Sequence, residues 1–216
     1  MMESFEDRLR RFLEHEDEAP VTLLVWAQNL LLPQVRVAKD KRLDNLIFLS
    51  THGFIQTFSE KALGRKGQEA TNYFLQSFMD EKEQNRKFSH VSNELHEMRN
   101  VMAHQLFSSR THHIVLDYVM NEGWRRDNAM IHINPDVYAN QFIAAIDGGR
   151  LWQWKNFVTH EQRIKQKYLF ICDWLDLPKK DPIRIAVDQL AALTGLNDIR
   201  KAASAIDAQI NMRYNL

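Results

Sequence analysis

Apolar positions recur at helical spacing through most of the chain. Leu43, Ile47, Phe54 and Leu63, for example, mark one face of a helix over 43–63. Similar patterns predict further helices over 3–18, 20–32, 68–79, 89–107, 135–146, 150–176, 182–193 and 197–210. The pattern therefore predicts a mainly α-helical protein.

Prolines delimit the second predicted helix. Pro20 stands at its first turn, where proline is tolerated, and Pro33 is predicted to end it. Because Val21–Leu32 is apolar nearly all round, we expect it to be buried between elements or against a second copy of the chain. Val35–Arg42 is then predicted to be a basic linker.

One part of the chain has a different pattern. Ile114–Met120 and Ala129–Ile133 are rich in β-branched residues, and Asn121–Gly123 between them is a turn signal. These segments predict a small β-hairpin insert at about 113–133.

The predicted elements fall into three parts. Residues 1–39 form N-terminal helices that pack on a bundle, and residues 40–178 form the helical core with the hairpin. Residues 179–216 form a C-terminal extension of two helices.

Composition narrows the class of protein. Lys and Arg together number 28 and Asp and Glu also number 28, so net charge gives no support for nucleic-acid binding. The single Cys172 cannot form an internal disulfide, which fits a reducing compartment. The first residues lack the apolar core of a signal peptide, and Val21–Leu32 is too short to span a bilayer. We therefore expect a cytoplasmic protein that does not enter a membrane.

Several kinds of site are excluded by spacing. His96-Glu97 is followed by Asn100 where a zinc-protease helix has its second His, and Gly64–Gly67 lacks the phosphate-binding loop pattern. The surroundings of Cys172 are typical of a buried thiol. We expect no metal and no cofactor.

The segment Arg99-Asn100-Val101-Met102-Ala103-His104 is the strongest candidate for chemistry. A neutral imidazole can take a proton from a hydroxyl, and a guanidinium can bind a phosphate through two hydrogen bonds. Asn100 could orient either group. On one straight helix, however, Arg99 lies about 140° round from His104, so the two are not an ideal pair.

This segment resembles the signature of the HEPN superfamily, in which Arg and a polar residue precede a His by a few positions. The resemblance covers about 40–176 and implies a helical bundle that acts as a metal-independent endoribonuclease, often a toxin or defence protein. It implies Arg99, Asn100 and His104 as catalytic residues. It also implies RNA as substrate, a homodimer with a composite cleft, and an antitoxin or regulatory protein as a further partner.

Less specific interpretations stay open. Arg99 could form a surface salt bridge with Glu94 or Glu97, and His104 could be a satisfied interface residue. The chain would then be a non-catalytic dimerisation or interaction module, or an RNA-binding regulator. A possible RNA surface combines cations and aromatics, although the same pattern fits a helix with Trp inside and Lys outside. Its members are Arg150, Trp152, Trp154, Lys155, Arg163, Lys165 and Lys167. Arg125 and Arg126, in the predicted hairpin, are a second basic pair.

Overall fold

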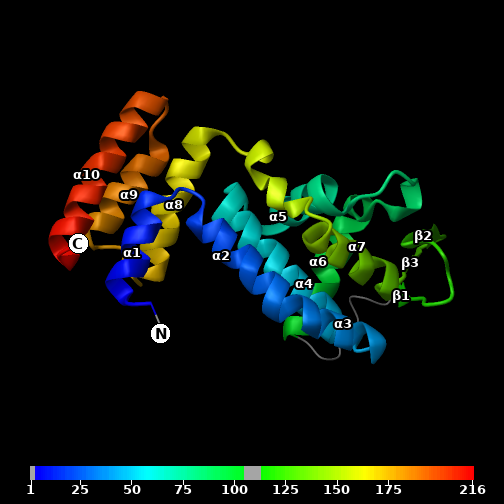
Figure 1. Ribbon diagram of the computed structural model, residues 1–216. Coiled ribbons are helices and arrows are strands. Elements are labelled where there is room, and N and C mark those ends of the chain that lie inside the picture. Colours follow the sequence, from blue (N-terminus) through cyan, green and yellow to red (C-terminus); the bar gives the residue numbers. More distant parts are fainter. Residues whose placement is uncertain (1–2, 105–112) are drawn as a thin grey trace. The chain divides into compact units, whose positions relative to one another are not determined.

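The computed structural model describes residues 3–104 and 113–216 and is mainly α-helical with a small three-stranded sheet (Figure 1). The chain divides into two compact units. The first comprises Met1–Leu23, Lys61–Gly64 and Lys155–Leu216, and the second comprises Leu24–Glu60 and Arg65–Trp154. Each unit is described by itself.

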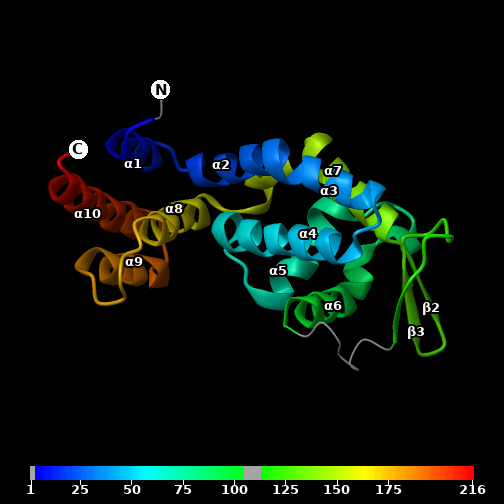
Figure 2. The ribbon, with the colours of Figure 1, turned by 90° about the horizontal axis from the view of Figure 1, so that it is seen from below.

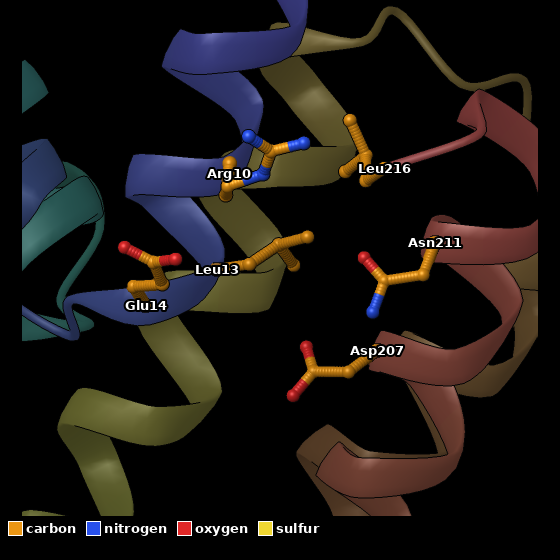
Figure 3. Close-up of a pocket in the computed structure, with 6 residues that line it drawn as sticks. All are labelled: Arg10, Leu13, Glu14, Asp207, Asn211 and Leu216. Carbon is orange, nitrogen blue, oxygen red and sulfur yellow. The ribbon is translucent and has the colours of Figure 1, made fainter.

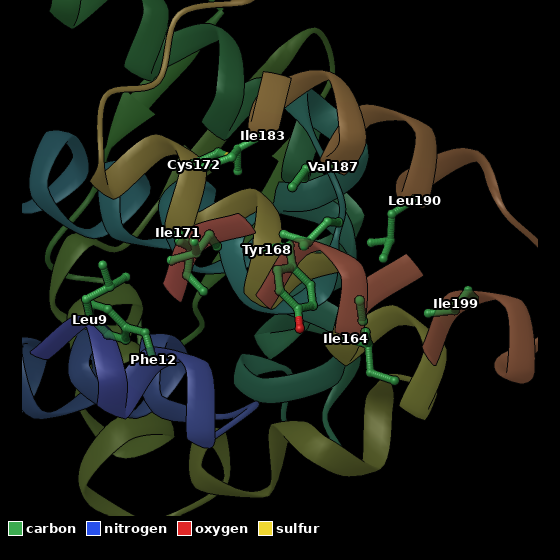
Figure 4. Packing of buried hydrophobic residues seen from close by; sticks show 13 residues of the cluster. Leu9, Phe12, Ile164, Tyr168, Ile171, Cys172, Ile183, Val187, Leu190 and Ile199 are labelled. Carbon is green, nitrogen blue, oxygen red and sulfur yellow. The ribbon is translucent and has the colours of Figure 1, made fainter. Parts of the chain in front are cut away.

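The first unit is built from helices at the two ends of the chain. Its elements are α1 (Phe5–Glu14), α8 (His160–Trp174), α9 (Pro182–Ala192) and α10 (Leu196–Tyr214). α8 contacts all three of the others, and their apolar faces share one core, which Figure 4 shows from close by.

Side-chain caps fix where these helices begin. Ser4 accepts a hydrogen bond from the backbone of Asp7 at the start of α1. Thr159 and Gln162 form a reciprocal capping box at the start of α8. Asp181 accepts from the backbone of Ile183 at the start of α9. Such caps satisfy amide groups that a helix leaves without partners.

The second unit is organised around one helix. α4 (Asp44–Phe58) contacts α3, α5, α6 and α7, and Figure 2 shows α5 and α6 beside it. The aromatic rings of Phe54, Phe58 and Phe74 contact one another in its core. The other helices are α3 (Leu32–Asp40), α5 (Gly67–Phe74), α6 (Ser92–His104) and α7 (Pro135–Asp147), while α2 (Glu18–Trp26) crosses the division between units.

Shorter helical turns extend or connect these helices. π-helical turns follow α2, α4 and α5 directly, so the predicted helices over 43–63 and 68–79 are present as α-helices with a widened last turn. The π turns are Ala27–Leu31, Ser59–Leu63 and Leu75–Met79, and the 3₁₀ turns are Gln84–Arg86, Phe88–Val91 and Leu151–Phe157.

The predicted β insert is present, but its pairing differs from the prediction. β1 (Ile114–Leu116) is shorter than expected and pairs in parallel with β3 (Met130–Ile133). The antiparallel hairpin is formed by β2 (Trp124–Asp127) and β3. Its turn contains Asn128 at φ 52°, a left-handed conformation that Asn tolerates. The predicted turn at Asn121–Gly123 lies before β2 instead.

The predicted helix end at Pro33 is wrong. The helix continues through the π turn Ala27–Leu31 into α3, so Val35–Arg42 is not a linker. Proline lacks the amide that an α-helix would use at this position, and its ring crowds the preceding turn. The widened π turn immediately before Pro33 offers a physical reason why the helix continues.

Two other boundaries differ. The predicted helix over 150–176 is divided into the 3₁₀ turn Leu151–Phe157 and α8, because Thr159 caps a new helix start. The helix predicted to begin at residue 89 begins at Ser92 instead, as α6. The hydroxyl of Ser89 instead donates to Asp80, whose carboxylate also accepts from the Ser89 amide. The predicted continuation of α6 over 105–107 lies outside the described residues.

The predicted division at residue 178 separates α8 from α9, whereas in the structure both helices belong to the first unit. The predicted helices over 182–193 and 197–210 are present as α9 and α10. Among the described helices, none has the length and apolar character needed to cross a bilayer.

Candidate functional site

α6 carries the candidate segment, and its position follows from its apolar face. Leu95 and Met98 are buried, and α6 contacts both α4 and α5. The backbone of His104 ends the helix, while its side chain lies outside the described part of the structure. The predicted pairing of Arg99 with His104 therefore stays a prediction.

Arg99 and Asn100 are both half-buried and contact each other. Nη1 of Arg99 donates to Oδ1 of Asn100 over 3.0 Å. Nε of Arg99 is buried and has no hydrogen-bond partner among the described residues. A buried donor without a partner costs about 1–3 kcal/mol, so the hydrogen-bonding capacity of this guanidinium is not fully used by the described residues.

The two acids expected to form salt bridges with Arg99 contact other residues instead. Glu94 accepts from Arg126 of β2 over 3.0 Å, and Glu97 lies 3.8 Å from His113. Within residues 3–104 and 113–216, neither acid has an ion pair with Arg99. The positive charge of Arg99 is therefore not neutralised by its own helix.

Two histidines lie beside Arg99 and were not singled out as a pair by the sequence. His52 of α4 is only 2% exposed, and its Nε2 lies 3.3 Å from Nδ1 of His96 on α6. Oγ1 of Thr71 on α5 lies 3.2 Å from the same Nε2. Nε2 of Gln56 lies 3.4 Å from Nδ1 of His96. Three helices thus contribute to one polar cluster.

The environment keeps both imidazoles neutral. Burial lowers the pKa of His52 to about 3, with further lowering from His96 and Arg99. The pKa of His96 is also lowered, first by burial and then by the charge of Arg99. At neutral pH the cluster therefore carries one positive charge, on Arg99.

The sequence contained a partial signal for this cluster. His52 falls among the apolar residues of α4, and His96 precedes Arg99 by three positions. A His on an apolar helix face needs a buried partner, but the sequence does not say which residue supplies it.

Metal ligands do not gather in the described part of the chain: no group of three or more His, Cys, Asp or Glu side chains there could hold an ion. Cys172 is buried, and burial raises the pKa of its thiol to about 11. It is therefore a poor nucleophile at neutral pH.

The predicted basic and aromatic surface is largely used for internal contacts. Lys155 pairs with Asp17, and Trp154 is buried. Lys165 and Lys167 donate to the backbone carbonyls of Leu193 and Leu13. The four arginines also have internal contacts: Arg150 with the backbone carbonyl of Asp80, Arg163 with Glu16, Arg125 with Asp117 and Arg126 with Glu94. Trp152 is exposed. These contacts favour the structural interpretation of that pattern.

Pockets occur away from α6. One of about 320 Å³ lies in the first unit, where Figure 3 shows Arg10 and Glu14 of α1 opposite Asp207 and Asn211 of α10. Another of about 590 Å³ lies in the second unit and mixes acids with bases. It is lined by Asp80, Glu81, Lys82, Glu83, Lys87 and Arg150.

Comparisons with family models, with curated proteins and with solved structures each gave no match to this chain. The interpretation of the site therefore depends on the residues themselves and on the resemblance of the Arg99–His104 segment.

Proposed function

We propose that this chain is an HEPN-like, metal-independent endoribonuclease. Its substrate is RNA, and the residues that act are Arg99, Asn100 and His104. The function would suit a toxin or defence protein, with an antitoxin or other regulatory protein as a partner.

The reaction is an internal transfer at one phosphodiester. His104 takes the proton of the ribose 2′-hydroxyl, and the 2′-oxygen then bonds to the adjacent phosphorus. The bond from phosphorus to the 5′-oxygen breaks, and that oxygen takes up a proton. The products are a 2′,3′-cyclic phosphate and a 5′-hydroxyl. Arg99 offsets the charge that develops on the phosphate, and Asn100 holds the guanidinium.

The observation that carries this proposal is the state of Arg99. Its guanidinium is held by Asn100, has a buried Nε without a described partner, and is not paired with either acid of its own helix. A cation that is held in place without an acidic partner among the described residues favours binding of an anion. A phosphodiester is the anion that the neighbouring sequence signature suggests.

A homodimer is part of the proposal. Along one helix Arg99 and His104 are separated by about 140°, so one phosphate is poorly placed for both. A second copy could supply the other half of a composite cleft. This arrangement predicts that two different inactive variants, Arg99→Ala and His104→Ala, recover some activity when mixed, because one cleft of the mixed dimer is then intact.

The test is RNA cleavage by purified protein in the presence of a chelator, with the product ends mapped. We expect cyclic phosphate and 5′-hydroxyl ends from the parent protein. The proposal is overturned if no RNA is cut, or if His104→Ala cuts as fast as the parent.

A second candidate is a non-catalytic interaction module that self-associates. It is favoured by large apolar side chains that remain exposed along the helix from α2 to α3, including Trp26, Leu30 and Val37. Leu30 is 55% exposed and Val37 is 59% exposed. If this candidate is correct, Leu30→Glu should dissociate the assembly in sedimentation experiments, while no RNA is cut by any variant.

A further inference from the structure

His96 lies on the same face of α6 as the proposed catalytic residues. Arg99 follows it by three positions and Asn100 by four, which places them about 60° to one side of it and about 40° to the other. The side chains of all three are half-buried. His96 therefore lies between them, one helical turn toward the start of α6.

The inner edge of the His96 ring is fixed by its neighbours. The amide nitrogen of Gln56 carries only hydrogens to donate, so Nδ1 of His96 accepts from it over 3.4 Å. His52 lies on the same edge and is itself held at 3.2 Å from Thr71. In a neutral imidazole, a ring whose Nδ1 accepts carries its proton on Nε2.

The other edge of the ring is available. Among residues 3–104 and 113–216, the hydrogen-bond partners of His96 are all at Nδ1. The half-buried ring therefore has an Nε2–H donor without a described partner, three positions before Arg99 on the same helix, and Nε of Arg99 also lacks a described partner. A fixed, neutral donor beside a fixed cation suits an anionic oxygen, because it adds a hydrogen bond without competing for charge.

We propose that His96 is a substrate-binding residue whose Nε2–H donates to a non-bridging oxygen of the same phosphodiester that Arg99 holds. This inference rests on the proposed ribonuclease function and adds a fourth residue to its site. His52, Gln56 and Thr71 are positioning residues, because they act only through the orientation and tautomer of the His96 ring.

Two variants of His96 test the roles of its Nδ1 and Nε2 atoms separately. Asn places a polar group near the Nδ1 position and retains the contact with Gln56, but it has no donor at the Nε2 position. Gln reaches toward the Nε2 position with a donor. His96→Asn should therefore weaken phosphate binding and His96→Gln should restore part of it. His90→Asn is the matched control, since His90 is exposed and precedes α6.

The experiment measures binding of a 2′-O-methyl RNA oligonucleotide, which cannot be cut because it lacks the attacking hydroxyl, alongside cleavage of unmodified RNA. We expect the Kd of His96→Asn to rise by about tenfold, the size expected for one hydrogen bond to a charged group. His96→Gln should recover part of that loss, and His90→Asn should bind like the parent. Circular dichroism melts verify that each variant is folded.

The outcomes distinguish this inference from the function on which it rests. If the parent cuts RNA but both His96 variants bind as tightly as the parent, the inference is overturned and the function stands. If the parent binds the oligonucleotide but cuts no RNA, and His96→Asn binds it more weakly, the phosphate contact is supported and the nuclease is not. If the parent neither binds nor cuts, both are overturned.

Discussion

The two units of this protein differ in what they bury. The core of the first unit is almost wholly apolar, and among its described residues Asp181 is the only polar or charged side chain that is buried. Asp181 is accounted for, because it caps α9 and pairs with Arg213. The second unit buries several polar side chains: Thr51, His52, Ser59, Thr71, Ser92, Asn134 and Gln141.

Some of the polar groups in the second unit have evident structural roles. Asn134, for example, caps α7 and also donates to the backbone of Met120. His52 and Thr71 do not cap a helix: His52 contacts His96 of α6, and Thr71 contacts His52. Burial of such groups costs free energy that an apolar core would avoid. The difference teaches that the first unit can be explained by stability alone, whereas the second includes a feature that suggests function.

Loss of the proposed catalytic groups is expected to have the largest effect. Arg99→Ala and His104→Ala should each lower the rate of RNA cleavage by about 10²–10⁴-fold, because each removes a group that acts in the transition state. Arg213→Ala in the first unit is the control, since its partner is Asp181. Single-turnover rates on a labelled RNA compare the three variants. Equal losses of rate in all three would contradict a catalytic role for Arg99 and His104.

Truncation of a buried side chain in the first unit should destabilise that unit without changing the candidate site on α6. Ile183 and Ile185 lie on the same helix, but the first is 3% exposed and the second 44%. Ile183→Ala should lower the free energy of unfolding by about 2–5 kcal/mol through lost burial and a cavity. Ile185→Ala should change it by less than about 1 kcal/mol. Urea denaturation measures both, and similar losses would mean that burial does not distinguish them.

Stability should depend on pH through the second unit. The pKa of His52 is about 3 in the folded protein against 6.5 as the ordinary value, so between these values the unfolded chain binds the extra proton. Folding stability is therefore unaffected above pH 6.5 and falls as the pH drops below it.

From pH 6.5 to pH 5 the loss attributable to His52 is about 2 kcal/mol, at about 1.4 kcal/mol per pH unit. His52→Gln should flatten this part of the profile, whereas His90→Gln on the exposed turn before α6 should not. Urea denaturation over this pH range is the measurement. An unchanged slope in His52→Gln would show that the buried imidazole is not the titrating group.

The smallest effect is expected where the sheet contacts α6. Arg126 and Glu94 form a partly exposed ion pair, so Arg126→Ala should lower the free energy of unfolding by less than about 1 kcal/mol. Cleavage should stay within about threefold of the parent, since Glu94 is not proposed to act on RNA. A much larger loss of activity would extend the functional site to β2.

Helical elements were predicted well where apolar spacing was regular. The structure contains the helices predicted over 43–63, 68–79, 182–193 and 197–210. Errors occurred where a second principle overrode the pattern. The π turn before Pro33 lets that helix continue, and the Thr159 capping box begins a new helix inside an apparently continuous segment. In the sheet, the parallel pairing of β1 with β3 depends on a non-local contact that alternation alone does not specify.

The candidate site likewise has a part that the sequence indicated and a part that it did not. Arg99 and Asn100 were identified from the sequence, and the structure describes their mutual contact. The cluster of His52, Gln56, Thr71 and His96 was not identified, because each of its contacts joins residues 19 to 44 positions apart along the chain.

The sequence by itself determined the helical character of this protein and identified the segment from Arg99 to His104 as the strongest candidate for chemistry. Both depend on residues a few positions apart, within the reach of helical periodicity. Only the tertiary structure decided that Arg99 lacks an acidic partner on its own helix and that two neutral histidines lie beside it. The burial and neighbours of a charged group depend on how separate helices pack, and local spacing does not specify that packing.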